Sequence, residues 1–129
     1  MIVKCTKLIN PNTGEAEQNS PWRTVGREYT VLEIYMGHDD KILSYRLQSD
    51  DNMSPTLSHA ELFDVTSDYI PSTWAVSNKT DGWFGLGPKS WQQAGFWVAY
   101  FDGEEWAREL YQREVDKMID EESQRSLTA

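Results

Sequence analysis

Apolar and polar residues alternate in several short segments of the first 78 residues. Residues 28–36 and 43–48 alternate most regularly, with a period of two, which is typical of β-strands that bury one face. His38, Asp39 and Asp40 form a polar connection between these segments. The pattern therefore predicts a β-hairpin with a polar tip.

Shorter segments of the same kind occur on both sides of this hairpin. Residues 1–9, 62–65 and 73–76 are rich in β-forming residues, and the stretches that separate them contain proline, glycine, asparagine and aspartate. These breaks are typical of turns between strands. The sequence therefore predicts a β-rich region over residues 1–78.

The segment 82–101 combines glycines with large aromatic residues and is the hardest to assign. Pro88 favours the first turn of a short helix that continues through Trp91. We expect most aromatic rings from Trp74 onward to be core, and any exposed ring to be an anchor for a protein partner. These rings are Trp74, Trp83, Phe84, Trp91, Phe96, Trp97, Tyr100, Phe101 and Trp106.

The last part of the chain has apolar residues at helical spacing. Asp102 followed three residues later by Glu105 resembles a capping box, so we expect a helix over about 103–122. Residues 102–122 contain nine acids and three bases, which gives this segment two-thirds of the chain's net charge of −9. Glu104 with Arg108, and Glu109 with Arg113, have the spacing of i,i+4 ion pairs. The remaining acids point either to a partner or only to solvent.

Length and composition fit a single domain of residues 1–129. No apolar run is long enough to span a membrane, and the first residues do not resemble a signal peptide. Cys5 is the only cysteine, which suits a reducing compartment. We therefore expect a cytoplasmic protein that makes no membrane contact and is monomeric when free.

The acidic balance of the chain bears on its partners. With 21 acids, 12 lysines and arginines and an isoelectric point near 4.6, the chain is poorly suited to bind phosphate backbones. We therefore expect no nucleic-acid partner and favour a basic protein. The alternative, that the acids serve only solubility, stays open.

Residues suited to catalysis are few. The two histidines, His38 and His59, have no second histidine or cysteine at metal-ligand spacing, and no nucleotide-binding glycine motif is present. A small hydrolase built on His59 with Ser54 or Ser58 is a less favoured alternative, because residue types alone support it. We therefore expect no enzymatic activity, no metal site and no cofactor.

A pattern of strand, turn and core positions extends over residues 25–34, 45–47, 60–65, 70–74, 87–91 and 95–103. In these stretches the chain resembles a group of small bacterial proteins, some of which look like immunity proteins of toxin systems (contact-dependent inhibition or polymorphic toxins). The resemblance extends from Thr24 to about Ile119 and implies an α+β fold: an antiparallel SH3-like β-barrel or curved sheet with a C-terminal α-helix packed against it.

The resemblance, the charge and the aromatic content together suggest an immunity protein that binds and neutralises a cognate, basic protein toxin. The alternative is an SH3-like adaptor that binds through exposed Tyr29, Tyr35 and Trp74. The candidate partner-binding residues are Asp39, Asp40, Asp50, Asp51, Glu105, Glu109, Asp116, Tyr35 and Trp74.

Overall fold

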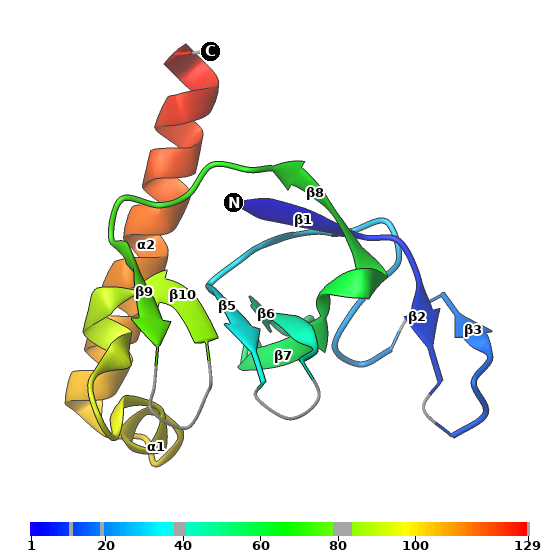
Figure 1. Cartoon of the computed structure of the whole chain (residues 1–129), viewed down its shortest axis with the longest axis horizontal. Coiled ribbons are helices and arrows are strands. Elements are labelled where there is room, and N and C mark those ends of the chain that lie inside the picture. Colours follow the sequence, from blue (N-terminus) through cyan, green and yellow to red (C-terminus); the bar gives the residue numbers. More distant parts are fainter. Residues whose placement is uncertain (11, 19, 38–40, 79–83, 129) are drawn as a thin grey trace.

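The computed structural model describes residues 1–10, 12–18, 20–37, 41–78 and 84–128. Figure 1 shows its strands and helices. The strands are β1 (Ile2–Cys5), β2 (Leu8–Ile9), β3 (Ala16–Glu17), β4 (Glu28–Thr30), β5 (Glu33–Met36), β6 (Leu43–Gln48), β7 (Pro55–His59), β8 (Phe63–Ser67), β9 (Trp74–Asn78) and β10 (Phe84–Pro88). The helices are two short 3₁₀ helices, η1 (Ala60–Leu62) and η2 (Lys89–Gln92), and two α-helices, α1 (Phe96–Phe101) and α2 (Glu105–Thr128).

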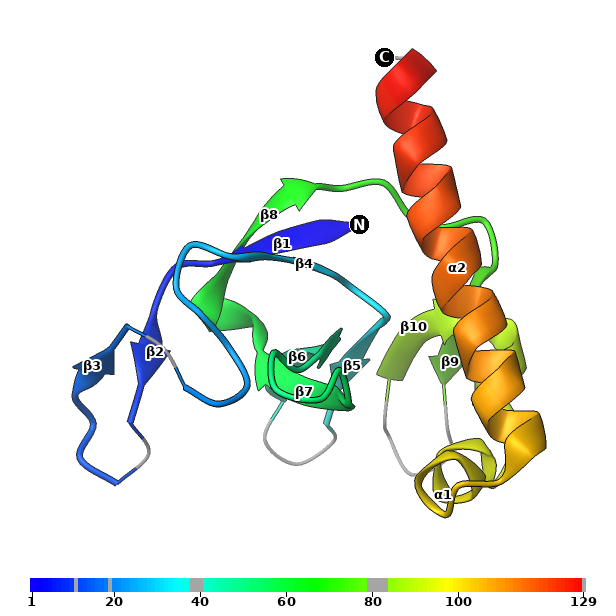
Figure 2. The same ribbon diagram turned by 180° about the vertical axis from the view of Figure 1, so that it is seen from behind.

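The strands form antiparallel sheets. One has the order β4-β1-β8, the second β7-β6-β5-β10-β9, and β2 and β3 form a small hairpin. The long helix α2 lies beside the five-stranded sheet, and its C-terminal end extends past both larger sheets (Figure 2). The predicted α+β class with antiparallel strands and a C-terminal helix is confirmed. The described strands do not close into a barrel.

The hairpin predicted from residues 28–36 and 43–48 is confirmed for β5 and β6, which pair directly, with Glu33 opposite Arg46. Residues 28–36 were predicted as one strand, but they form two strands, β4 and β5, in different sheets. The chain crosses between the sheets at Val31, whose N–H donates to the Met1 carbonyl, and Leu32, whose N–H donates to the Arg46 carbonyl. Both side chains are fully buried because sheet residues surround them on each side, so the alternation breaks here.

Strand β10 lies in the aromatic and glycine-rich segment that resisted assignment. Gly85 of this strand pairs with Tyr35 of β5, and Gly87 lies so close to Glu33 of β5 that no Cβ atom would fit there. After β10, Pro88 precedes η2 as expected, although η2 is a 3₁₀ helix. The sequence also did not predict β7 or α1, which are both present.

The predicted capping box of the C-terminal helix is wrong. Asp102 ends α1, because its N–H donates to the carbonyls of Tyr100 and Val98. Gly103 then adopts a left-handed conformation with φ of 81°, which favours glycine. The Glu104 N–H closes this turn on the Ala99 carbonyl, and α2 follows from Glu105. The helix continues to Thr128, beyond the predicted end at residue 122. Among the described residues, no helix is long and apolar enough to cross a membrane.

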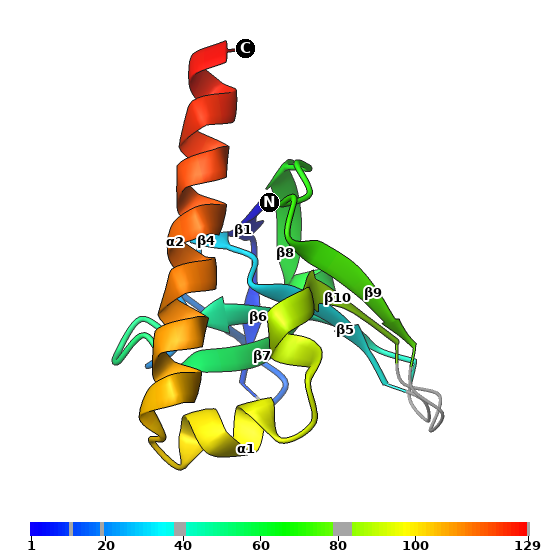
Figure 3. The same ribbon diagram turned by 90° about the vertical axis from the view of Figure 1, so that its left-hand side faces the viewer.

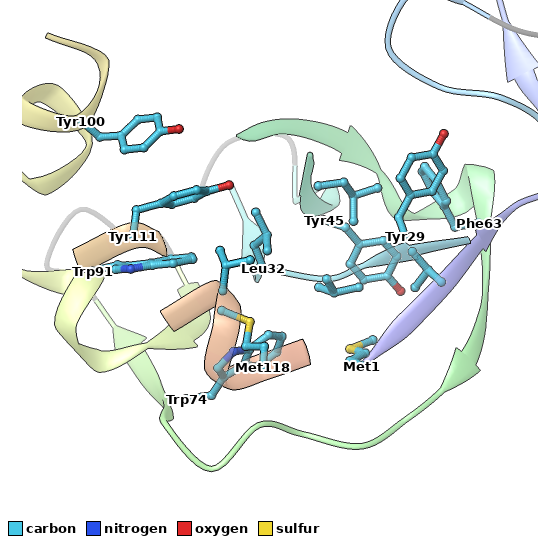
Figure 4. Close-up of a cluster of buried hydrophobic side chains, with 14 of the residues drawn as sticks. Met1, Tyr29, Leu32, Tyr45, Phe63, Trp74, Trp91, Tyr100, Tyr111 and Met118 are labelled. Carbon is cyan, nitrogen blue, oxygen red and sulfur yellow. The ribbon is translucent and has the colours of Figure 1, made fainter. Parts of the chain in front are cut away.

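The core has two aromatic groups (Figure 4). In the first, Phe63 makes edge-to-face contacts with Tyr29 and Tyr45, each with ring centroids 6.1 Å apart. In the second, Trp91 stacks on Tyr111 with centroids 5.2 Å apart, and also on Phe96. Leu32 lies between the groups, so one continuous core joins the N-terminal sheet to the helices.

Cys5 lies inside this core, in the central strand of the three-stranded sheet. Its side chain is fully buried, as expected for a lone thiol that packs as a small apolar group. Burial raises the pKa of the Cys5 thiol. The neutral thiol is therefore the form that the folded protein favours.

Candidate partner-binding surface

The two acids predicted just after β6 differ in their surroundings. Asp50 is a structural residue: it accepts hydrogen bonds from the hydroxyls of Tyr29 (2.9 Å) and Thr24 (2.8 Å), and Arg27 lies 3.4 Å away. Asp51 is exposed, and its carboxylate accepts a hydrogen bond from the next backbone N–H. The predicted residues Asp39 and Asp40 lie outside the described residues. Asp50 is therefore poorly placed to meet a partner.

The three predicted acids on α2 are exposed and share one face of the helix. Glu105, Glu109 and Asp116 are separated by four and seven residues, which places them in a line along the helix. Asp120 continues this line one turn later and is also exposed. The sequence-based selection of these residues thus identified a line of exposed acids on α2, beside which Arg113 is also exposed.

Other acids of α2 are engaged inside the protein. Glu114 is buried, accepts a hydrogen bond from the Ser90 hydroxyl at 3.2 Å, and has Lys117 at 3.9 Å. Glu121 accepts hydrogen bonds from Tyr69 and from the N–H and hydroxyl of Ser72. These contacts attach α2 to η2 and to the loop before β9, so neither acid is available to a partner.

Glu121 and its neighbour Glu122 make their contacts within the protein as ionised carboxylates. Burial raises the pKa of Glu121, but the hydrogen bonds from Ser72 and Tyr69 outweigh it and hold the pKa below its usual value. Burial likewise raises the pKa of Glu122, and the Ser67 hydroxyl and the amino terminus outweigh it. Both carboxylates are therefore charged at neutral pH as structural groups.

The basic residues of α2 do not form the ion pairs predicted for it. Arg108 turns back to α1, donating its Nε to the Tyr100 carbonyl at 2.8 Å and covering the Tyr100 ring at 4.1 Å. In the described part of the chain, ion pairs link neither Glu104 with Arg108 nor Glu109 with Arg113. The acidic face is thus not neutralised by pairs along the helix.

The aromatic residues proposed for partner contact are largely internal. Trp74 is 9% exposed and Tyr29 is 7% exposed, so both belong to the core. The expectation that they are exposed is wrong, because β9 and β4 turn these side chains inward. Tyr35 is half-buried on β5. The exposed aromatic groups of an SH3-like peptide groove are therefore not assembled by these three residues.

A different set of apolar side chains is exposed where α1 meets α2. Val98 is 68% exposed, Phe101 53% and Trp106 44%. Helix α1 buries Phe96, Ala99 and Tyr100, and it packs against α2 and η2, whereas Val98 and Phe101 on its other side are exposed. These apolar side chains and the exposed acids next to them in the sequence are called the corner surface. The corner surface comprises Val98, Phe101, Asp102, Glu104, Glu105, Trp106 and Glu109.

A narrow cleft lies between the five-stranded sheet and η2. Its floor includes Glu33 and Tyr35, its walls include Trp91 and Trp97, and its volume is about 30 Å³. The Arg46 Nε lies 2.6 Å from Glu33 Oε1, and the Arg46 guanidinium covers Trp97 at 4.1 Å. A cleft of this volume has room for about one water molecule. The Arg46 guanidinium thus already contacts two of the side chains that line the cleft, Glu33 and Trp97.

Gly87 allows β10 to lie close to β5 beside this cleft. A Cβ atom on Gly87 would lie 2.6 Å from the Glu33 Cβ, so one of the two strands must shift. We expect Gly87→Ala to lower the free energy of unfolding by about 1–3 kcal/mol, as overpacking does. Urea unfolding followed by circular dichroism measures this change.

Gly85→Ala is the matched control, since a Cβ there would make only an ordinary contact of 3.6 Å with Tyr35. Its effect should stay within about 0.5 kcal/mol. Equal losses in the two variants would contradict the role given to Gly87.

A larger groove lies beside the β2–β3 hairpin, with a volume of about 600 Å³. Ile9, Trp22 and Leu57 line it and are about half exposed. Arg23 forms its floor, donating to the Trp22 and Thr56 carbonyls and to Ser58, and burial lowers the pKa of its guanidinium. Each guanidinium nitrogen already donates within the protein, so Arg23 fixes the loop before β4 to β7.

The residues considered for hydrolysis are not brought together. The Ser58 hydroxyl accepts a hydrogen bond from Arg23 at 3.0 Å, and His59, the next residue of β7, is exposed. Consecutive strand residues point to opposite faces. Among the described residues, no group of three or more histidine, cysteine or acidic side chains is arranged to hold a metal ion.

The sequence analysis did not select Val98, Phe101 or Trp106 as site residues, although Phe101 and Trp106 are among the rings expected to anchor a partner if exposed. Residues 96–101 are apolar throughout, so no polar position marks which side faces solvent.

Comparison of the chain with protein-family models, with curated proteins and with solved structures gives no match.

Proposed function

We propose that this chain is a binding protein of the immunity type, which neutralises a basic protein toxin by covering it with the corner surface. One observation carries the proposal: three exposed apolar side chains at the α1–α2 corner lie among exposed acids. Surfaces that combine an apolar centre with a charged surround are typical of protein interfaces. The acidic face of α2 extends the same charge along the helix.

The two parts of the corner surface have different roles in this proposal. Phe101 and Trp106 supply area that a partner removes from water, which gives affinity. The acids attract a basic partner over a longer range and speed its association. Because Glu114, Glu121 and Glu122 are engaged internally, the long-range attraction comes from the acids that remain exposed.

We also propose that the sheet is related to those of SH3-like proteins and that the protein is located in the cytoplasm. Consecutive antiparallel pairing of β5, β6 and β7 supports a relation to SH3-like sheets. In this proposal the chain acts by covering a surface of its partner and carries out no reaction of its own. Fold alone does not determine such a role, so binding must be measured.

The test is capture of the partner from native cells by tagged protein at low salt, followed by association kinetics with the captured protein. We expect Glu105→Lys with Glu109→Lys to slow association about tenfold, because steering depends on charge. Added salt should slow the wild-type association in the same way. Phe101→Ala should instead speed dissociation.

The control is Glu61→Lys with Asp64→Lys, which makes the same change of charge at exposed positions on η1 and β8. Its association rate should remain within about threefold of the wild-type rate. If both double variants bind alike, or if the captured protein is acidic, the proposal is wrong.

A further inference from the structure

Strand β9 forms a rim of the five-stranded sheet. It pairs with β10 on one side and with no described strand on the other. Figure 3 shows β9 at the outer rim, on the opposite side of the molecule from α2. An unpaired sheet edge is a template for another strand.

The register shows which groups of β9 point outward. The Lys89 N–H donates to the Thr73 carbonyl, so this position is a hydrogen-bonded pair of the β9–β10 ladder. Such pairs alternate with non-bonded pairs in antiparallel sheets. Trp74 opposite Pro88 and Val76 opposite Leu86 are therefore non-bonded pairs. The N–H and carbonyl of Val76 consequently point away from β10, and its side chain is 62% exposed.

Most sheet edges of this protein carry a feature that disfavours pairing, such as a charge or a proline. Strand β7 begins with Pro55, β4 contains Glu28 and β8 contains Asp64. In the described parts of the chain, β9 is the only edge strand longer than two residues that has neither. Its five residues read Trp-Ala-Val-Ser-Asn.

The sheet face next to this edge is also apolar. Val76 pairs with Leu86, which pairs with Ile34, so these side chains form a row across three strands. This row is buried where it meets Tyr45 and exposed at Val76. A parallel row consists of Phe84, Met36 and Leu43. The core face of the sheet thus continues to the rim, where it is partly exposed.

We propose that a second copy of this chain pairs with β9 in antiparallel orientation, centred on Val76. The two Val76 residues would exchange both N–H···O=C hydrogen bonds, and the Asn78 N–H of each copy would reach the Trp74 carbonyl of the other. The Trp74 N–H is already used by the Pro71 carbonyl. The two Val76 side chains meet on the same face and remove each other from water.

The chemistry of β9 selects a second copy over the basic partner proposed above. The strand has no acid to attract a basic protein. Two chains of net charge −9 repel each other elsewhere, and an uncharged strand is where they approach at least cost. This inference is independent of the proposed function. It departs from the monomer expected from the sequence.

Sedimentation velocity over about 10 μM to 1 mM tests the inference, because this range covers weak protein association. We expect the wild-type sedimentation coefficient to rise with concentration. Higher salt should strengthen the dimer by screening the repulsion, the opposite of its expected effect on the basic partner.

Val76→Pro removes the outward N–H and replaces the valine side chain, but it removes no hydrogen bond of the β9–β10 ladder, as proline allows at an edge. It should weaken dimerisation about tenfold or more. Val76→Thr keeps the N–H and the β-branched shape, so it should dimerise within about threefold of wild type. Circular dichroism checks that Val76→Pro is folded, and Val76→Lys, which opposes two like charges, replaces it if it is not.

A sedimentation coefficient that stays constant over this range would overturn the inference. A dimer that persists in folded Val76→Pro or in Val76→Lys would overturn it as well, because the contact would then lie elsewhere.

Discussion

Phe96→Ala is expected to lower the free energy of unfolding by about 3–5 kcal/mol, the usual cost of removing a buried aromatic ring. Phe96 is 1% exposed, and its ring contacts Trp91, Trp97 and Trp106. The cavity would open between α1 and η2, where three neighbouring tryptophans are too rigid to fill it. Urea unfolding followed by tryptophan fluorescence measures the loss.

Val98→Ala is the matched control, since Val98 lies on the same short helix and is 68% exposed. We expect its effect to stay within about 0.5 kcal/mol. A small loss for Phe96→Ala, comparable to that of the control, would mean that α1 is not part of the cooperative core.

Arg46→Ala is expected to cost about 3–5 kcal/mol for a different reason, because it leaves the buried carboxylate of Glu33 without its partner. The two side chains are 12% and 7% exposed and their charged atoms lie 2.6 Å apart. The same substitution removes the guanidinium from the Trp97 ring. Thermal and urea unfolding both report this loss.

A double variant separates these contributions. Glu33→Gln combined with Arg46→Met removes both charges and keeps similar volumes, so it should recover about half of the lost stability or more. If the double variant is as unstable as Arg46→Ala, the loss comes from the guanidinium's own contacts with Trp97 and the Pro55 carbonyl and not from the stranded charge.

The local pattern of the sequence was sufficient for the β5–β6 hairpin, because both strands have one face toward solvent or a cleft and one toward the core. It failed at Val31 and Leu32, which are buried together where the chain passes between sheets. Alternation identifies a strand only when one of its faces stays polar. A crossing between two sheets buries successive residues and therefore has no such signature.

Strand β10 was not predicted, because the residue that requires a glycine in it lies far away in the sequence. Gly87 leaves room for Glu33 on β5, and only the folded sheet brings these two residues together. Asp102 was misassigned by an opposite kind of error. Its capping pattern was local and plausible, but Gly103 ends one helix before the next begins.

The candidate site was predictable in its charges and unpredictable in its aromatic part. Residues 105, 109 and 116 share a face by helical spacing alone, and the structure places them on the solvent side of α2. Trp74 and Trp106 are not distinguishable in sequence, yet one is 9% and the other 44% exposed. Their positions in the packing, and not their residue types, decide which ring a partner can reach.

The buried Cys5 allows local opening of the three-stranded sheet to be measured through the rate at which its thiol is alkylated. Its thiol is buried in the hydrophobic core on one face of this sheet, so an alkylating reagent reaches it only when the sheet lifts away from that core. The labelling rate under native conditions therefore gives the free energy of that opening. Comparison with global unfolding distinguishes a sheet that detaches alone from one that opens only together with the helices.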